Sequence, residues 1–560
     1  MIFHSLISLY TRLARINDVP SYGFSKEDIG FVLHIDKAGN LIGEPEDLRI
    51  QIKQNVFDFC ISEVPYSNQV NVRSSSAAET PNFMVDKADY IFGMSRNEKK
   101  EKHNESFFNL IKEVCGDSDD EGVVAVKSFL ENWIREDSLK LKDWKEISGA
   151  YGKWIAFKLM GDSKFVHERD EVRRLWVYHI SKIKYPRGVS FVEGDVNDLQ
   201  TQYAQFKFGS GASLVSFNEV AYESYGKKKG ENAPISVDAE FKSAAALKYL
   251  LRSKAQRLRI GDTTTVFWAE KQSSLETFMG MILNPSIEDK GSAIAVQKFL
   301  EAVRDGKYPG DIEQDKDLKF YILGLSQNKA RLALRFWYVS TVKDLTERLS
   351  NHFKCLEMEK SKNDYTQPFV WNLLKETARE PKNISPILNG ALMRSILTGV
   401  NYPQNLYQGV LGRIRADQAK HDEKTGKPTP HVNYLRAAIL KAVLQRNHKM
   451  EVPMSLDLNR REVEYLLGRL FAVLERAQYD ALGKVNTTIK DRFFSAASAT
   501  PASVFPRLIR LSNHHIKKAG DIAEDRISEI MEHINEFPSQ MSLQQQGLFA
   551  IAYYQQKNAF

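Results

Sequence analysis

Histidines and carboxylates are the residues that most often supply catalytic bases and metal ligands. His167 and Glu168 are not followed by the second histidine of a zinc-protease motif. His421 and Asp422 lie in a stretch rich in Lys, Gly and Pro, whereas a metal nuclease needs further ligands on packed helices. The chain has no GxxxxGK[S/T] phosphate loop, no GxGxxG loop after a strand and no GxSxG motif. We therefore expect no catalytic residues, no metal and no cofactor.

Side chains suited to nucleic-acid binding gather in the segment GSGASLVSFNEVAYESYGKKKG, residues 209–230. Glycines let a backbone approach a partner closely. Hydroxyl and amide groups bond to base edges and phosphates, tyrosines stack on bases, and lysines attract phosphates. The alternative is a structural Gly/Ser turn followed by a solvated run of lysines. The side chains of interest are Ser216, Asn218, Tyr222, Ser224, Tyr225, Lys227, Lys228 and Lys229.

A second group of candidates lies on a predicted antiparallel hairpin. FYILGL (residues 320–325) and RLALRFWYV (residues 331–339) flank a short polar loop. In the second strand Arg331, Arg335 and Trp337 share one face, because alternate residues of a strand point the same way. Such a face could meet phosphates and bases, but a solvated sheet surface or a contact with a neighbouring domain is the favoured interpretation.

The elements that must position these groups change in character along the chain. Residues 31–36 and 263–268 have the composition of strands, the latter buried. From about residue 380 onward the chain shows successive helical patterns, with SLQQ at 542–545 as a capping box. The sequence predicts an α+β protein, with a mixed α/β region and an antiparallel sheet over residues 1–380. A C-terminal α-helical bundle follows over residues 381–560.

Charge is distributed unevenly. The 560 residues carry a net charge of +7, which permits an anionic partner without requiring one. Residues 391–450 hold ten Lys/Arg against three Asp/Glu, and residues 481–520 hold seven against one. The three cysteines are far apart, which argues against disulfides, and no long apolar run predicts a membrane span. We expect a soluble cytoplasmic protein.

Many short blocks, collinear over nearly the whole chain, resemble the large subunit of the type I-C CRISPR Cascade complex, the Csd (Cas-eight) family. The first blocks are PNFMVDKADYIFG (81–93), SLVSFN (213–218), YESYGK (222–227), NAPIS (232–236), VFWAE (266–270) and LGLSQNKARLALRFW (323–337). The later blocks are NISP (383–386), LGRIRA (411–416), VPMSLD (452–457), YLLGRLFAVLE (465–475), TIKDR (488–492) and QGLF (546–549).

The resemblance implies a binding subunit in the cytoplasm of a bacterium, and not an enzyme. Such a subunit recognises a protospacer-adjacent motif in duplex DNA, promotes unwinding and R-loop formation, holds the displaced strand and helps to recruit a helicase–nuclease. The guide RNA reads the target sequence. The implied partners are crRNA, the target DNA, the backbone and crRNA-end-capping subunits, a small helical subunit and the helicase–nuclease. The family also implies internal translation, here from Met450 or Met454, which would produce residues 450–560 as a separate small subunit.

The resemblance also assigns roles to the candidate residues. Motif reading is expected of Asn82, Ser216 and Asn218, because amide and hydroxyl donors suit minor-groove acceptors, although a backbone cap is an alternative for Asn82. The loop of Gly209, Ser210 and Gly211 is the expected wedge. Phosphate contacts are expected of Arg73, Ser224, Tyr225, Lys227, Lys228, Arg331 and Arg335. Displaced-strand contacts are expected of Arg413, Arg415, Lys490, Arg492 and Lys517.

Two other classes of function fit the sequence. A standalone single-stranded-DNA-binding protein would bind DNA without partners. A metal-dependent nuclease would need a cluster such as Asp417, His421 and Asp422, which are the only local candidates. DNA affinity that does not depend on salt would argue against the phosphate contacts.

Overall fold

A computed structural model gives the fold. It describes residues 1–54, 56–68, 80–96, 98–149, 153–208, 210–217, 219–260, 263–283, 298, 317–328, 331–361, 364, 366–420, 429–483, 485 and 487–560. The chain forms two compact units, the first made of residues 1–253 and 325–334, the second of 254–324 and 335–560. The α+β class is confirmed. The expected boundary at residue 380 lies within the second unit, where the helical run already begins at Val342.

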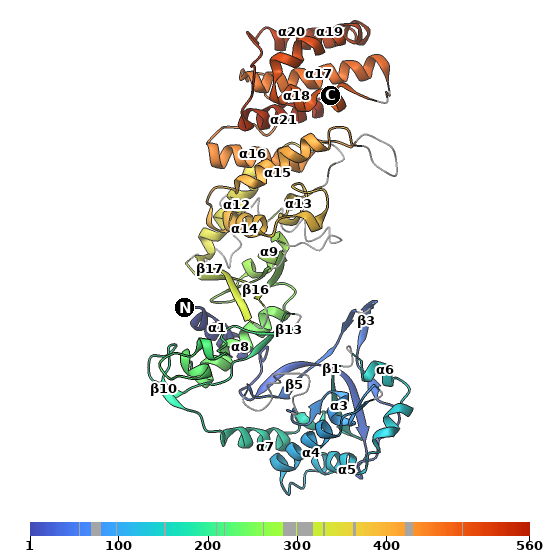
Figure 1. Cartoon of the computed structure of the whole chain (residues 1–560), viewed down its shortest axis with the longest axis vertical. Coiled ribbons are helices and arrows are strands. Elements are labelled where there is room, and N and C mark those ends of the chain that lie inside the picture. The colour runs from blue at the N-terminus through green and yellow to red at the C-terminus, as the bar shows by residue number, and fades with distance from the viewer. Residues whose placement is uncertain are drawn as a thin grey trace. The chain divides into compact units, whose positions relative to one another are not determined.

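The first unit is built around a mixed sheet. Strand β1 (Phe24–Ile35) pairs in parallel with β9 (Trp154–Leu159) and antiparallel with β2 (Glu46–Asp47) and β5 (Cys60–Pro65), and β6 (Val85–Asp86) borders β9. Helices α3 (Ala88–Ile91), α4 (Glu101–Cys115) and α5 (Glu121–Asn132) cover it (Figure 1). Phe31, Leu33 and Phe157 are fully buried among them. This packing supplies the apolar core on which the unit depends.

Smaller elements complete the first unit. Helix α1 (Ile2–Ala14) packs against α8 (Val237–Arg252). The remaining helices are α6 (Trp144–Ile147) and α7 (Asp170–Ser181). The remaining strands are β3 (Ile50–Lys53), β4 (Val56–Asp58), β7 (Met94–Ser95), β8 (Glu98–Lys99), β10 (Arg187–Val189), β11 (Val196–Asp198), β12 (Gln205–Phe208) and β13 (Ser210–Ser213).

The predicted hairpin of the central region is confirmed. Strands β16 (Lys319–Asn328) and β17 (Arg331–Thr341) are hydrogen-bonded neighbours, and β15 (Thr263–Ala269) and β14 (Arg257–Ile260) follow β16. Residues 266–269 of β15 are buried, as their apolar composition predicts. Helix α9 (Ser274–Leu283) packs near β14 and β15.

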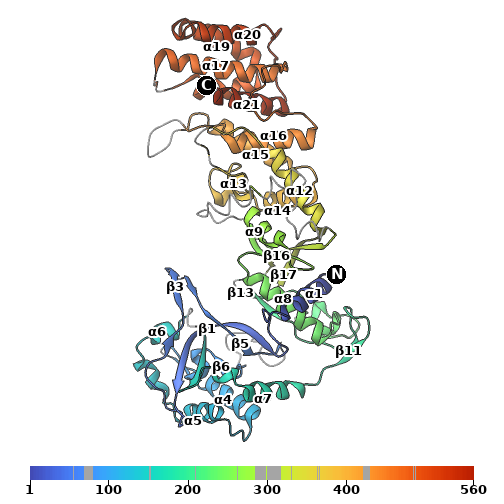
Figure 2. The same ribbon diagram turned by 180° about the vertical axis from the view of Figure 1, so that it is seen from behind.

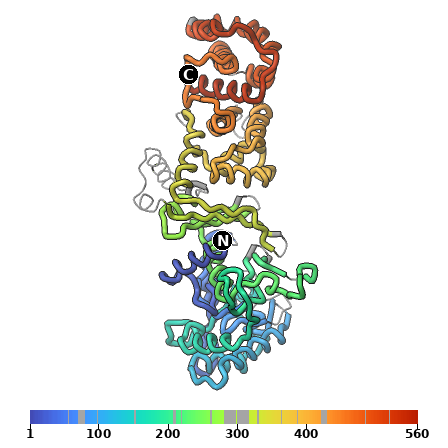
Figure 3. The backbone as a smooth tube through the Cα atoms, turned by 90° about the vertical axis from the view of Figure 1, so that its left-hand side faces the viewer, coloured from blue at the N-terminus to red at the C-terminus, as the bar shows by residue number. Residues whose placement is uncertain are grey.

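From Val342 onward, the regular elements of the described residues are helices (Figures 2 and 3). Helix α17 (Val463–Leu482) packs on α19 (Pro501–Ala519), α20 (Asp521–Met531) and α21 (Leu543–Asn558). The predicted capping box is confirmed, since Ser542 accepts from the Gln545 N–H. The other helices are α12 (Val342–Leu356), α13 (Val370–Lys375), α14 (Pro386–Thr398), α15 (Gln404–Ala416), α16 (Tyr434–His448) and α18 (Ile489–Ala499).

Helix α21 is buried along nearly its whole length because α17 and α16 both pack against it. Its turn at Gly547 lies against Tyr407, whose hydroxyl donates to the Leu543 carbonyl at 3.0 Å. A separate product of residues 450–560 would lack α16 and would expose this face. The internal start at Met450 or Met454 stays a prediction.

Gly468 permits the close approach of α17 to α21 and offers a test of the packing. A Cβ at this position would lie 2.3 Å from the Phe549 carbonyl oxygen. We expect Gly468→Ala to lower the free energy of unfolding by about 1–3 kcal/mol, because backbone cannot yield to the added methyl group. Denaturant unfolding of the full chain measures this.

Gly412→Ala on α15 is the matched control, since a Cβ there would meet nothing within 4 Å. It should stabilise the chain by up to about 1 kcal/mol through helix propensity. Equal effects of the two substitutions would contradict the close packing.

Candidate nucleic-acid interface

The structure brings the predicted wedge hairpin next to one of the predicted phosphate contacts. Strands β12 and β13 pair antiparallel, with Gly211 opposite Lys207, and Ser213 of β13 lies opposite Arg331 in a parallel pair. The Arg331 guanidinium lies over the Tyr222 ring, 3.8 Å from its centroid. A cation over an aromatic face is attracted by the ring quadrupole. Strand β13, Tyr222 and Arg331 therefore lie close together in the first unit.

The loop that follows contains a tight turn at residues 224–227. The Lys227 N–H donates to the Ser224 carbonyl at 3.0 Å, and these two residues form an isolated antiparallel bridge. Tyr225 has φ 53° and Gly226 has φ 71°, so both central residues are left-handed, as a type I′ turn requires. Tyrosine rarely adopts this conformation, and the surrounding contacts must hold it there.

Asn232 holds the turn from both sides. Its Oδ1 accepts from the Ser224 N–H at 3.0 Å and from the Ser224 hydroxyl at 3.2 Å. Its Nδ2 donates to the carbonyls of Lys227 at 2.9 Å and Lys229 at 3.1 Å. One amide side chain thus uses its acceptor and its donor together, and residues 224–229 become a preorganised element.

The end of this loop is anchored to the body of the first unit. Tyr203 donates from its hydroxyl to the carbonyls of Gly230 and Ala233, at 3.3 Å and 2.5 Å, and burial raises the pKa of this phenol. Position 230 needs glycine, since a Cβ there would lie 2.4 Å from the Gln200 carbonyl oxygen. The turn therefore projects from a fixed base.

The turn presents an aromatic ring and positive charge to solvent. Tyr225 is 99% exposed, and Lys227, Lys228 and Lys229 are exposed beside it. A fully exposed ring on a rigid backbone loses little entropy when it binds. A base can stack on the ring while the lysines contact phosphates. Asn232 had no assigned role in the sequence, although the Tyr-Gly pair could have indicated the turn.

The residues expected to read the motif are not exposed on this turn. Asn82 is 2% exposed, and its N–H donates to Asp86 Oδ2 at 2.7 Å, so its side chain is not accessible for direct base contact in this conformation. Ser216 is half-buried beside the loop. Arg73, Gly209 and Asn218 lie outside the described residues, and only the backbone of Ser210 is described. Arg335 is exposed and belongs to the second unit.

The five residues expected to hold the displaced strand separate into two groups. Arg413 pairs with Asp417, and Arg415 donates to Gln546. Lys490 is 3% exposed, pairs with Asp491 at 2.7 Å and donates to the Gln418 carbonyl. These contacts make Lys490 a structural lysine, and we do not use it for strand binding. Arg492 and Lys517 are exposed.

Asp417, a candidate metal ligand of the nuclease alternative, binds two arginines. It pairs with Arg436 at 2.7 Å and with Arg413. Burial raises the pKa of this carboxyl, but the hydrogen bond and charge of Arg436, with Arg413, outweigh burial and hold the pKa below its usual value. His421 and Asp422 lie outside the described residues. Within the described part of the chain, no three His, Cys, Asp or Glu residues gather as a metal site.

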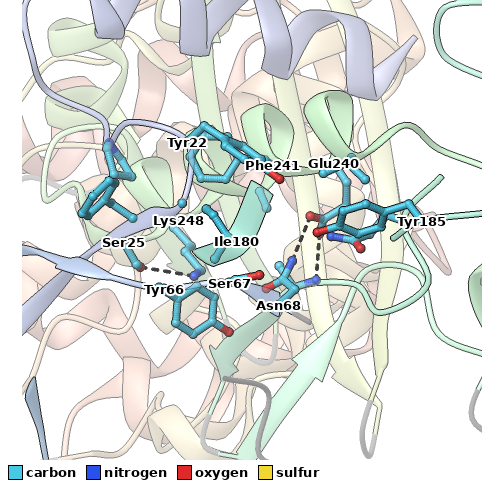
Figure 4. Close-up of a pocket in the computed structure, with 18 residues that line it drawn as sticks. Tyr22, Ser25, Tyr66, Ser67, Asn68, Ile180, Tyr185, Glu240, Phe241 and Lys248 are labelled. Carbon is cyan, nitrogen blue, oxygen red and sulfur yellow. Dashed lines mark hydrogen bonds between the residues drawn. The ribbon is translucent and has the colours of Figure 1, made fainter. Parts of the chain in front are cut away.

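Glu240 of α8 lines a small pocket in the first unit (Figure 4). Glu240 accepts from the Ala204 N–H at 2.7 Å and from Asn68 Nδ2 at 2.8 Å, and Lys248 points toward Ser25 nearby. The cavity volume is about 40 Å³, which holds water but is far below the roughly 300 Å³ of a small-molecule site. The pocket is therefore too small for a ligand of that kind, and the hydrogen bond to Glu240 holds the Asn68 side chain in place.

Glu240 should make the stability of the chain depend on pH. Burial raises the pKa of Glu240 from 4.5 to about 7, against hydrogen bonds and the Lys248 charge that lower it. The unfolded chain releases this proton at a lower pH than the folded chain does. The contribution of Glu240 to the free energy of unfolding is therefore complete below pH 4.5 and is lost as the pH rises to about 7. The loss is on the order of 3 kcal/mol at most. Thermal melts of wild type and Glu240→Gln between pH 4.5 and 8 measure it. The variant should have the flatter profile, and parallel profiles would contradict the assignment.

Asn232 should control the rigidity of the lysine-bearing turn. We expect Asn232→Ala to accelerate tryptic cleavage after Lys227, Lys228 or Lys229 by about tenfold, because each lost hydrogen bond contributes about 0.5–1.5 kcal/mol and cleavage requires local opening. Peptide mapping during limited proteolysis measures the rate. Asn197→Ala removes a single 3.3 Å bond to Asp195 and should leave it unchanged. Equal cleavage of wild type and Asn232→Ala would contradict the role of Asn232.

Comparison with known proteins agrees with the blocks noted in the sequence. Among curated proteins, none matches the chain. Among the described residues, no helix combines the length and apolar character needed to cross a bilayer. The profile of the CRISPR-associated protein family Cas_Csd1 matches residues 6–560, nearly the whole length. The chain therefore belongs to the Csd1 family of CRISPR-associated proteins.

Proposed function

We propose that this chain is the large subunit of a type I-C Cascade complex and that it binds target DNA through the turn at residues 224–229. In this role it recognises the adjacent motif in duplex DNA, promotes unwinding and R-loop formation, holds the displaced strand and helps to recruit a helicase–nuclease. Its partners are crRNA, the backbone and crRNA-end-capping subunits and a small helical subunit. The family membership supports a CRISPR complex.

The single observation that carries the proposal is the rigid, exposed Tyr225 beside three lysines. At the end of a duplex that is being opened, one base pair loses its stacking partner. A tyrosine ring held at that point replaces the lost stacking, which is worth about 1–3 kcal/mol per base. Lysines 227–229 hold the backbone next to it, and Arg331 over Tyr222 extends the basic surface.

In this proposal the subunit acts only by binding and catalyses no reaction. Sequence is read by pairing with the guide RNA, so the protein needs to read only a short motif and the shape of the duplex. The carboxylate of Asp417, the described member of the nuclease alternative, is already neutralised by Arg413 and Arg436. We propose no catalytic step for this chain.

Removing the Tyr225 ring tests the stacking contact. In the assembled complex with guide RNA, we expect Tyr225→Ala to weaken binding of a motif-bearing target duplex by about 1–3 kcal/mol, because one base loses its stacking surface. Equilibrium binding at fixed salt measures this. Tyr178→Ala is the control, since Tyr178 is also an exposed tyrosine of the first unit, 61% accessible on α7. Equal affinity of wild type and Tyr225→Ala would refute the contact.

Removing two lysines tests the phosphate contacts separately. For Lys227→Ala/Lys228→Ala in the same complex, the slope of log affinity against log salt should fall in magnitude by about 2, because each lost phosphate contact removes about 0.9. The loss should be the same for duplexes of different sequence, since phosphate contacts carry no base information. An unchanged slope would show that these lysines remain in solvent.

The standalone single-strand-binding alternative predicts a different result. A protein of that kind binds single-stranded DNA tightly without guide RNA, and its affinity for the target does not change when the guide is present. The proposed subunit gains target binding only when the guide and the backbone subunits are assembled with it.

A further inference from the structure

A large groove in the second unit lies apart from every residue considered so far for nucleic-acid binding. Its volume is about 1050 Å³. Helix α12 contributes Arg348, Asn351, Lys354 and Cys355 to one wall, and helix α16 contributes Lys441, Gln445 and Arg446 to another. Most of the other lining residues come from the segment 449–462. The positions on α12 and α16 recur every three or four residues, so each helix turns one face toward the groove.

The groove is preformed. The segment after α16 is held by Gln445 Nε2, which donates to the Val452 carbonyl at 3.3 Å, and by the Glu359 N–H, which donates to the Met454 carbonyl at 2.9 Å. Further along, the Asp457 N–H donates to the Tyr465 hydroxyl at 3.0 Å. These bonds fix the wall opposite α12 without any ligand.

Its charge is mostly positive and mostly uncompensated. Of the carboxylates that line the groove, Glu462 pairs with Arg460 at 2.8 Å, and Asp457 accepts from the Asn459 N–H at 2.9 Å. Glu357 and Glu451 are the other two lining carboxylates, and the charge of Glu357 acts on Lys441. Five lining cations form no ion pair within the described part of the chain: Arg348, Lys354, Lys441, Arg446 and Lys449.

Lys441 is the most informative of the five. It is 2% exposed, and its ammonium donates only to the Cys355 carbonyl, at 3.3 Å, among the residues that the structure describes. Burial lowers the pKa of Lys441, against the charge of Glu357 nearby. A buried ammonium that forms no direct ion pair is costly, and a fixed anion in the groove would relieve part of that cost. Arg446 and Arg348 are held beside it by the carbonyls of Ser395 and Leu397.

We propose that this groove binds the phosphate backbone of a single nucleic-acid strand. No aromatic side chain is among the lining residues, so the groove offers charge and not a stacking surface. Its size exceeds that of one phosphate and suits a strand that tracks along several cations. The inference rests on the proposed function only for the choice of a nucleic acid as the polyanion. The guide RNA and the displaced DNA strand share this chemistry.

Cys355 provides a direct readout of occupancy because it lines the groove and is partly exposed. The chain has three cysteines, of which Cys115 is buried and Cys60, in the first unit, is partly exposed. The full chain is alkylated with iodoacetamide in the presence of single-stranded DNA, single-stranded RNA or polyglutamate, and each cysteine is quantified by peptide mapping.

Oligonucleotide should slow the alkylation of Cys355 several-fold and leave Cys60 unchanged, and high salt should abolish the protection. Unchanged alkylation of Cys355 at a saturating oligonucleotide concentration would overturn the proposal. Protection by polyglutamate and not by oligonucleotide would also overturn it, in favour of an acidic protein partner.

Two sets of variants make the test independent of Cys355 reactivity. Lys354→Gln/Lys449→Gln should lower the magnitude of the salt slope for single-stranded oligonucleotides by about 1.4, since each phosphate contact contributes about 0.7. Lys343→Gln/Lys375→Gln, which alters two exposed lysines outside the groove, should leave it unchanged. Lys441→Met should weaken binding while the melting temperature of the free chain stays level or rises. A lower melting temperature with unchanged affinity would make Lys441 purely structural.

The assembled complex distinguishes the two strands. Protection of Cys355 in the guide-RNA complex before target is added assigns the groove to the guide, and protection only after target opening assigns it to the displaced strand. If Cys355 is never protected but Tyr225→Ala still weakens duplex binding, the groove proposal fails and the proposed function stands. If Cys355 is protected but Tyr225→Ala leaves duplex binding unchanged, the proposed contact at the turn fails and the groove proposal stands.

Discussion

The Asn232 side chain accepts two hydrogen bonds and donates two, and together they hold the backbone of residues 224–229 in a conformation that a tyrosine would otherwise avoid. A left-handed non-glycine residue costs on the order of 1–3 kcal/mol, and hydrogen bonds of about 0.5–1.5 kcal/mol each offset that cost. The fixed base supplied by Tyr203 and Gly230 completes the arrangement. Without this constraint, Tyr225 and the lysines would be an ordinary mobile loop, and the proposed DNA contact would have no defined geometry.

Much of the fold could be predicted because the relevant signals are local. The buried β15 strand follows from β-branched and aromatic residues, and the start of α21 follows from the Ser542 capping box. The left-handed Gly399 ends α14, and a glycine in that part of the sequence marks the break between helices. The division into compact units could not be predicted, because it depends on contacts between residues far apart in the chain.

The candidate site was only partly predictable for the same reason. The aromatic and basic composition of residues 222–229 indicates binding, but the role of Asn232 depends on where its side chain reaches. Lys490 looks like any basic residue in a positive stretch, yet packing buries it against Gln418, more than seventy positions away. The groove cations are spread from residue 348 to residue 449 on separate helices, so no local pattern groups them. Counts of charge locate basic stretches and do not tell structural charges from binding ones.

The two proposed sites would bind nucleic acid through different kinds of contact. The turn has a ring and exposed lysines, so it suits a place where a base loses its partner. The groove has cations and no ring, so it suits a strand whose bases are not read. In the proposed function, both sites leave recognition of the target sequence to pairing with the guide RNA.

A photo-crosslinking amino acid in place of Tyr225 tests the central claim most directly. In the complex assembled with guide RNA and bound to a target duplex, irradiation followed by sequencing of the crosslinked strand maps the position of the turn. The account predicts crosslinks to DNA at or next to the adjacent motif, where the duplex begins to open. Crosslinks confined to the guide RNA or to a neighbouring subunit would contradict it.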